Sequence, residues 1–308
     1  MEHKESAGSV IWRVIYPLLI FLAAEFVVEL AILIPKVANI VTANSDLLED
    51  ADALSEYLMD YVTRLSLYIT IGRAVILVPI FLLLMRRDRN VVDRAYGRYR
   101  EYGPFKKTWL LLLPVAGFTA AMGFNHVVPM VINGIEALIK AVFGRSINLF
   151  ATYESVSEVI YSGSVFVQIL AAAIAAPLVE ELLFRGLIFK RIRARFGFAA
   201  AAIWSALIFG IIHGNFVQFL YAFIIGLFLA YVYEKFKTIW ASVIFHAGAN
   251  FIAVIVTFIT NDEELGVPLG LYVLIIVTEL VATFAILWVI ETRFKREEIV
   301  PQDKVDNQ

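Results

Sequence analysis

Long apolar runs recur from one end of this chain to the other, and they limit its fold more than any other feature. A helix needs about 20 apolar residues to cross the hydrocarbon core of a bilayer. Eight such runs are present, two of them short, at residues 11–35, 65–85, 108–132, 164–188, 199–213, 217–233, 239–259 and 269–291. A hydrophobic fraction of 60% also suits a membrane protein better than a soluble one. The sequence therefore predicts an all-α, polytopic membrane protein with about eight transmembrane helices.

The basic residues are distributed unevenly between the runs, and this predicts the orientation. Of the 26 Lys and Arg, Arg73 and Arg185 lie deep inside runs, and four lie in loops on one side, namely Lys36, Arg64, Lys140 and Arg145. The remaining twenty lie on the other side, most densely between residues 86 and 107. Because Lys and Arg are enriched in cytoplasmic loops, we expect an even number of helices with both termini in the cytoplasm.

The polar segments divide the chain into three parts. Residues 1–135 contain the first three runs, with an acidic outer loop at 36–63 and a basic cytoplasmic loop at 86–107. Residues 136–292 contain the remaining runs and the polar motifs described next, and residues 293–308 form a polar cytoplasmic tail. The acidic loop is amphipathic, which predicts a helix that is solvated or lies at the membrane surface.

Two adjacent glutamates interrupt the fourth run, in the segment APLVEELLFRGLIFKRIR. A charge in the middle of a bilayer costs roughly 2.5–3.5 kcal/mol on insertion scales, so residues of this kind are commonly functional. Glu181 and Arg185 are four residues apart and share a helix face, where Arg185 can keep Glu181 ionised. Glu180 is rotated by about 100° and remains available as a general base. The alternative is an ion-pair cluster that serves folding alone.

Two histidines follow in later runs, each in an i, i+4 pair: FGIIH ends at His213, and HAGAN extends from His246 to Asn250. Two imidazoles, a carboxylate and an amide can activate a water molecule and stabilise an oxyanion. The same Glu180, His213 and His246 can instead hold zinc, with its fourth position open. Counted from Arg195, His213 lies about 27 Å into the membrane, so its helix must tilt or begin later, near residue 200.

Signatures of other hydrolase classes are missing from the sequence. The chain has no cysteine, which excludes disulfides, thiolate metal sites and cysteine nucleophiles. It contains neither the HExxH motif of zinc proteases nor a GxSxG motif, and no pair of aspartates lies within the runs. A net charge of −2 gives no indication of a nucleic-acid partner.

The motifs EExxxR, FxxxH and HxxxN, in that order on successive predicted membrane helices, resemble those of the CPBP family. This family comprises the CAAX prenyl endopeptidases of the Ras-converting type and bacterial relatives linked to bacteriocin processing and self-immunity. The resemblance covers about residues 160–260. It implies that residues 136–292 form a catalytic helical core, in a multi-pass protein that we expect in a bacterial plasma membrane.

The resemblance also implies a role for each motif residue. Glu180 would activate water, and His213 would assist it or ligate a metal. His246 and Asn250 would stabilise the oxygen of the scissile carbonyl group. The full implied site is Glu180, Glu181, Arg185, His213, His246 and Asn250, with Glu181 and Arg185 shaping it. The enzyme would be either zinc-dependent or a metal-independent, glutamate-dependent endopeptidase. Its substrate would be a peptide or a lipidated protein, of the CAAX or the bacteriocin type.

Two other classes of function stay open at this stage. An ion-coupled transporter would use the same buried charges, although the chain shows no inverted repeat of the kind many transporters have. A noncatalytic scaffold or immunity factor would bind a peptide without cleaving it, although the motif residues are all intact. Membrane lipids are expected contacts in each case, and the sequence does not indicate an oligomeric state.

Several charged residues lie in runs outside these motifs. Glu25 and Glu29 in the first run and Arg73 in the second lie at similar depths, which predicts an ion-pair cluster that joins the first two helices. His126 in the third run and Glu279 in the last have no assigned role. For His126, a hydrogen-bonded packing position is the simpler interpretation than a further ligand.

Overall fold

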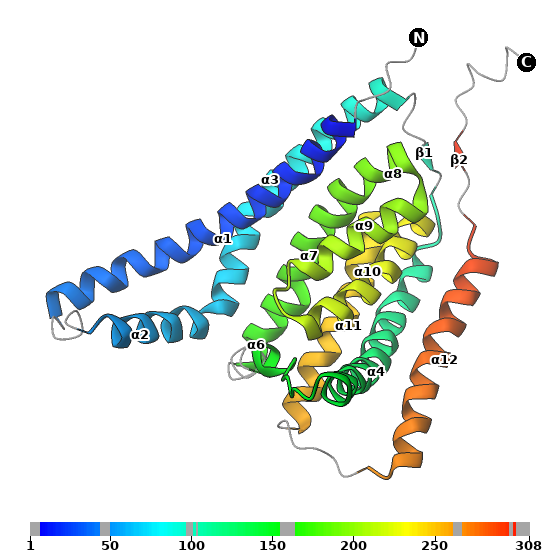
Figure 1. Cartoon of the computed structure of the whole chain (residues 1–308). Coiled ribbons are helices and arrows are strands. Elements are labelled where there is room, and N and C mark those ends of the chain that lie inside the picture. The colour runs from blue at the N-terminus through cyan, green and yellow to red at the C-terminus, as the bar shows by residue number, and fades with distance from the viewer. Residues whose placement is uncertain are drawn as a thin grey trace, which may run out of the picture.

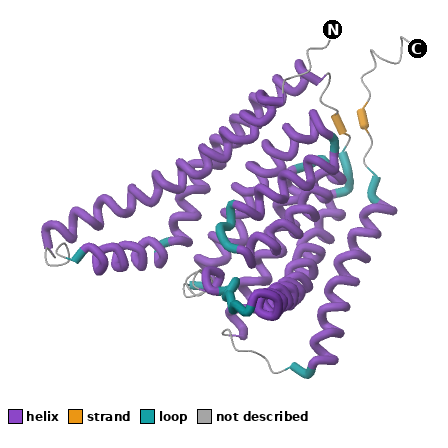
Figure 2. Tube along the Cα trace, in the orientation of Figure 1, coloured by secondary structure: helices purple, strands orange, loops and turns teal. Residues whose placement is uncertain are grey.

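The computed structural model describes residues 7–43, 50–96, 101–102, 104–154, 164–260, 267–295 and 298–299. This part of the chain is almost wholly helical, as Figure 2 shows. The α-helices are α1 (Ala7–Ala43), α2 (Ala51–Arg64), α3 (Ser66–Tyr96), α4 (Leu112–Phe143), α6 (Val165–Gln168), α7 (Ala176–Glu181), α8 (Lys190–Phe196), α9 (Phe198–Ile211), α10 (Phe216–Phe236), α11 (Ile239–Thr260) and α12 (Leu269–Arg293). A 3₁₀ turn, η2 (Lys107–Leu111), and two π-helices, η3 (Ile169–Ala175) and η4 (Leu182–Phe189), complete the helical set. Two short strands, β1 (Glu101–Tyr102) and β2 (Glu298–Ile299), pair in an antiparallel manner.

All eight predicted runs coincide with helices. Within the described residues, seven helices are long and apolar enough to cross a membrane, and the eighth run corresponds to the shorter apolar helix α9. The prediction of an all-α, multi-pass membrane protein is thus confirmed. The acidic loop contains α2, whose first turn is capped by the Asp50 carboxylate, an acceptor for the backbone N–H groups of Asp52 and Ala53. The cytoplasmic placement of the termini and the division into three parts remain predictions.

The helices form a long pair and a bundle, as Figure 1 shows. Helices α1 and α3 lie side by side and α2 connects them at one end, while α4 and α6 to α12 form the bundle. The start of α1 and the ends of α3 and α8 lie at the upper end in Figure 1, and α2 and α6 lie at the other end. The fourth run, Val165–Phe196, is one continuous helical span through α6, η3, α7, η4 and α8.

A buried polar cluster attaches the α1–α3 pair to α8. The guanidinium of Arg191, which is 2% exposed, donates to Asp88 on α3, with Nε 2.6 Å from Oδ2, and also to the backbone carbonyl of Arg13 and the hydroxyl of Tyr16 on α1. Arg13 itself pairs with Asp88 at 3.3 Å. Farther along the same pair, Arg73 binds Glu25 at 3.0 Å. Among the described residues, Glu25 and not Glu29 makes this ion pair with Arg73.

Small residues allow α4 and α11 to pack backbone against backbone. A Cβ at Gly117 would clash with the carbonyl oxygen of Phe245, and a Cβ at Gly248 would lie 2.5 Å from the Cα of Pro114. Close contact through small residues is typical of membrane helix pairs. Lipid tails are as apolar as Leu side chains, so the hydrophobic effect contributes little to helix association and close van der Waals packing matters more. This contact fixes the position of α11, which carries His246 and Asn250.

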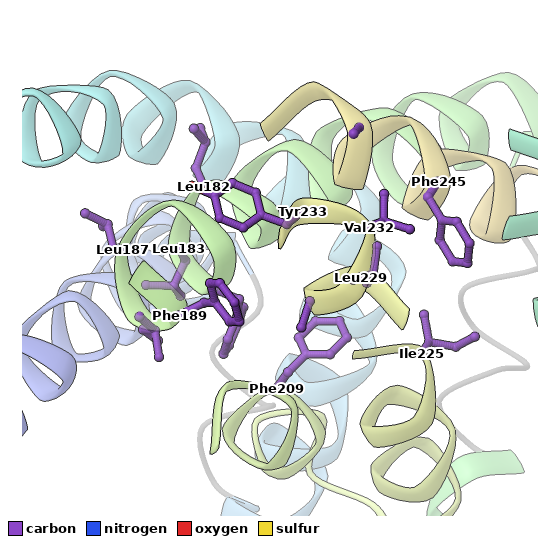
Figure 3. Close-up of a cluster of buried hydrophobic side chains, with 14 of the residues drawn as sticks. Leu182, Leu183, Leu187, Phe189, Phe209, Ile225, Leu229, Val232, Tyr233 and Phe245 are labelled. Carbon is purple, nitrogen blue, oxygen red and sulfur yellow. The ribbon is translucent and has the colours of Figure 1, made fainter. Parts of the chain in front are cut away.

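The interior of the bundle is filled by apolar side chains from η4, α9, α10 and α11. Figure 3 shows Leu182 of η4 beside Tyr233 of α10, with Leu183 and Leu187 on the same η4 segment and Phe209, Leu229 and Phe245 on the neighbouring helices. Most of these side chains are almost inaccessible to solvent. The polar motif residues therefore lie within a tightly packed surrounding, which holds their side chains in place.

Candidate active site

The two glutamates lie in a short α-helical segment between two π-helices. Helix α7 ends at Glu181, with η3 before it and η4 after it. Single π-helical turns within α-helices are rare and are frequent at functional sites. Glu180 and Glu181 are consecutive residues of α7, so they are about 100° apart around the helix and differ in burial. The Glu181 side chain is completely buried, whereas that of Glu180 is 13% exposed.

Glu181 and Arg185 form the predicted i, i+4 ion pair, and both side chains are completely buried. Arg185 Nη1 donates to Glu181 Oε1 at 3.0 Å, and Arg185 Nη2 donates to the carbonyl oxygen of Gly226 on α10 at 2.9 Å. The guanidinium carbon also lies 5.0 Å from the centre of the Phe209 ring. Arg185 thus joins η4, α9 and α10, and it compensates the charge of a carboxylate that has no access to water.

His246 lies between the two glutamates. Its Nδ1 is 3.0 Å from Glu181 Oε1, and its Nε2 is 3.7 Å from Glu180 Oε2. A carboxylate accepts hydrogen bonds, so Nδ1 carries a proton and donates it to Glu181. Glu181 therefore orients the imidazole, and the opposite edge of the ring faces Glu180.

His213 lies in the turn after α9, not within the helix. Its Nδ1 is 2.6 Å from the carbonyl oxygen of Phe209. That oxygen is one of the terminal carbonyls of α9, which lack a partner within the helix. Because a carbonyl only accepts, Nδ1 must be the donor, and the neutral ring then has its lone pair on Nε2. The FxxxH spacing therefore both caps the helix and fixes the tautomer of His213.

These side chains meet at one cavity of about 520 Å³. Glu180, His213, His246 and Asn250 all line it, whereas Glu181 and Arg185 lie behind its wall. The remaining lining residues come from α3, α4, the segment after α4, η3, α7, α9, α10 and α11. The polar residues among them are Ser66, Thr70, Arg73, Asn125, Tyr153, Gln218 and Tyr221. Four of the six predicted site residues thus face a common space, and the other two support them from behind.

Asn250 makes a contact that the motif alone does not predict. Its Nδ2 donates to the carbonyl oxygen of Ala172 at 2.8 Å, across 78 residues of sequence. In the π-helical pattern of η3, the N–H of Ala176 bonds to the carbonyl of Ala171, five residues earlier. The same pattern would pair the carbonyl of Ala172 with residue 177, which is a proline without an N–H. Asn250 supplies the hydrogen bond that Pro177 cannot.

This compensation predicts a coupling between Asn250 and Pro177. Asn250→Ala leaves a carbonyl without a donor, at an expected cost of about 1–3 kcal/mol in the free energy of unfolding. Pro177→Ala adds an N–H at residue 177, so the double variant should recover part of that loss. Unfolding by SDS titration in mixed micelles measures all four corners of the cycle, and effects that simply add would contradict the assignment.

The predicted zinc ligands do not form a three-ligand site. Glu180 Oε2 and His246 Nε2 lie 3.7 Å apart, and the contact between His246 Nδ1 and Glu181 leaves Nε2 available. Over the part of the chain that the structure describes, no three His, Asp or Glu side chains gather in an arrangement that could hold a metal ion. The described residues thus offer no third ligand beside Glu180 and His246 in this arrangement, and the chemistry below uses protein groups alone.

Outside the cavity, the remaining intramembrane charges have separate surroundings. His126 Nε2 lies 3.8 Å from Glu279 Oε2, and its ring packs edge-on against Tyr272. This contact joins α4 to α12, in keeping with a packing position for His126.

The sequence did not predict the roles of Phe209 and Gly226. Phe209 contacts His213, His246 and Arg185, and the spacing in FxxxH is a sequence signal for this role. The sequence holds no comparable signal that the backbone carbonyl of Gly226 accepts a hydrogen bond from Arg185.

Fold and site together define a multi-pass membrane protein with a buried carboxylate–imidazole cluster facing a cavity. Residues 162–252 match the family described as type II CAAX prenyl endopeptidase Rce1-like. A Bacillus subtilis (strain 168) protein named "Putative membrane peptidase YdiL" is 32% identical over 87 residues, which are 28% of this chain and 36% of that protein. The chain thus matches about a third of its curated relative's length. No solved structure gives a significant match. The resemblance to the CPBP family of membrane proteases is confirmed over this segment.

Proposed function

We propose that the chain is an intramembrane endopeptidase that hydrolyses a peptide bond of a membrane-associated or lipidated protein or peptide. The observation that carries the proposal is the convergence of Glu180, His213, His246 and Asn250 on one cavity. The match to a family of membrane endopeptidases supports the same kind of function. We place the protein in a bacterial plasma membrane, in line with its bacterial relative.

Glu180 is the proposed general base. Its carboxylate lines the cavity, whereas the neighbouring Glu181 is enclosed and held by Arg185 and His246. Glu180 takes a proton from a water molecule as the water oxygen attacks the carbonyl carbon of the substrate. When the C–N bond breaks, protonated Glu180 gives that proton to the departing nitrogen. His213 Nε2, with its lone pair available, accepts a hydrogen bond from the attacking water and orients it.

His246 and Asn250 are the proposed donors to the oxyanion. With its Nδ1 proton donated to Glu181, His246 presents Nε2 to the cavity, and the ring donates from Nε2 to the substrate oxygen when it carries both protons. Asn250 uses one N–H of its Nδ2 for Ala172 and keeps a second for the substrate oxygen. These donors are fixed before the substrate arrives, which is the condition for effective oxyanion stabilisation.

Replacing His213 tests the proposed water-orienting role. His213→Gln should lower kcat/KM on a quenched peptide set by about 10²-fold, the lower end of the range for general acid–base assistance. His126→Gln is the matched control, because His126 lies in a membrane helix but does not line the cavity. Equal activities for the two variants would contradict the proposal for His213. A wild type that cleaves none of the peptides would contradict the proposed activity itself.

Metal content decides between the two mechanisms that the sequence left open. Zinc is measured by mass spectrometry in the purified protein before and after treatment with a chelator, and cleavage is assayed in both samples. We expect cleavage to persist after the metal is removed, because Glu180 can act as the base without it. Stoichiometric zinc, with activity that is lost on its removal and restored on its return, would contradict the metal-independent mechanism.

A further inference from the structure

The cavity lies toward one end of the molecule, and that end is not the basic one. Its lining residues on α3 are in the first turns of the helix, from Ser66 to Arg73, whereas the basic residues Arg86 and Arg87 come later. On α10 the lining begins at Val217 and Gln218, and the basic residues again stand at the far end. Glu180 and His246 lie nearest the middle of their helices and form the deep end of the cavity.

On the remaining helices, too, the residues that line the cavity lie away from the basic end. Helix α9 begins beside the basic helix α8, and the cavity is lined by Phe209 near the end of α9 and by His213 in the turn that follows. The span Val165–Phe196 contributes Ala171, Ala172 and Ala176 from its first half, and its second half leads into α8. The residues that line the cavity thus extend away from the basic end, toward the end at which Figure 1 shows α2 and α6.

Helix lengths place the rim of the cavity at the opposite membrane surface. Ser66 precedes Arg86 by 20 residues of one helix, which is about 30 Å. Gln218 precedes Lys237 by 19 residues, or about 28 Å. The hydrocarbon core of a bilayer is about 30 Å thick. If the basic residues lie at one surface of the membrane, Ser66 and Gln218 lie at the other.

We propose that the substrate enters this cavity from the non-cytoplasmic side of the membrane. The positive-inside rule places the basic end in the cytoplasm, so the rim faces the opposite compartment. The substrate class is then a peptide segment presented on that side, such as the outer flank of a membrane-spanning protein or a peptide that has been translocated. The proposal rests on the proposed peptidase activity for its substrate, but the side of access is independent of that activity.

The composition of the cavity wall fits such a segment. Phe150, Val217 and Tyr221 provide apolar surface near the rim, and Thr70 and Gln218 provide groups able to pair with an extended backbone. Arg73 is the cation among the described lining residues, and Glu25 already compensates its charge. An uncharged, partly apolar peptide is therefore a better match than a strongly acidic or basic one.

The absence of cysteine from the chain makes the side of access directly measurable. Single cysteines are introduced at the rim, as Gln218→Cys and as Tyr153→Cys in the segment that packs against Val217, and at the basic end, as Lys107→Cys. Each variant is expressed in a bacterial host and treated with a membrane-impermeant maleimide, in intact spheroplasts and in inside-out vesicles. We expect both rim cysteines to be labelled in spheroplasts and Lys107→Cys to be labelled in vesicles.

The opposite labelling pattern would overturn the proposal, and so would rim cysteines that react from neither side, because the cavity would then not open to water at that surface. A second arm adds quenched peptide to the same spheroplasts and vesicles carrying the wild type. Cleavage in spheroplasts is expected, and cleavage only in vesicles would contradict access from outside. If labelling agrees but no peptide is cleaved even in detergent, the peptidase proposal fails while the side of access stands.

Discussion

Glu180→Gln is expected to lower kcat by about 10³–10⁴-fold, within the range for loss of a general base. Glutamine has nearly the same shape as glutamate and can still accept a hydrogen bond, but it cannot take a proton from water. KM should change little, because the substrate is held by the cavity wall and by the oxyanion donors. Michaelis–Menten kinetics on a cleavable peptide, with purified protein in detergent, measure both constants.

A matched control separates this chemical effect from the general effect of losing a membrane carboxylate. Glu279→Gln removes a glutamate that is also within a span but does not line the cavity. It should keep kcat within a small factor of the wild type, and both variants should unfold at similar temperatures. If Glu180→Gln retained most of its activity, Glu180 would not be the base. If both variants lost activity equally, the effect would be structural.

The membrane spans were predictable because length and apolarity alone define them. Each of the eight predicted runs coincides with a helix, and even the short run at 199–213 corresponds to α9. The pair Glu181–Arg185 was predictable for a similar reason, since residues four apart on a helix are neighbours whatever surrounds them. Local spacing also placed His213 against Phe209, although the contact uses the backbone carbonyl of Phe209 as well as its ring.

The depth of His213 could not be read from a count of residues. Counting from Arg195 assumed one helix, but Gly197 separates α8 from α9 with φ of 89°, a conformation that favours glycine. Helix α9 then begins at Phe198, and His213 lies in the turn beyond its end. Helix α8 continues the preceding helical span as far as Phe196.

Contacts between segments that are far apart in the chain could not be predicted from the sequence. The motifs suggested that His246 and Asn250 act on the substrate, but each also binds a protein partner, Glu181 and the carbonyl of Ala172 respectively. The contact between Asn250 and Ala172 exists because η3 is a π-helix, in which each backbone N–H bonds to the carbonyl five residues earlier and not four. Amino-acid composition does not determine whether a helix adopts the α or the π pattern, although Pro177, which has no N–H, indicates that one carbonyl before it lacks a backbone donor.

Arg185→Met should have the largest effect on stability of any single change at the site. It leaves the buried carboxylate of Glu181 with His246 as its remaining partner, and Gly226 loses the donor to its carbonyl oxygen. Removing one partner of a buried ion pair typically costs about 3–5 kcal/mol. We expect a large fall in the yield of folded protein and in the free energy of unfolding, measured by SDS titration in mixed micelles.

The double variant Glu181→Gln/Arg185→Met distinguishes an unpaired charge from the mere loss of a large side chain. Removing both charges should recover much of the stability, because a neutral amide costs far less to bury than a carboxylate without its cation. Glutamine at position 181 can still accept the hydrogen bond from His246 Nδ1 through its carbonyl oxygen. Arg191→Met is not an equivalent control, since that guanidinium serves the separate cluster with Asp88. A double variant as unstable as Arg185→Met would mean that Arg185 acts through its packing against Phe209 and not through the charge of Glu181.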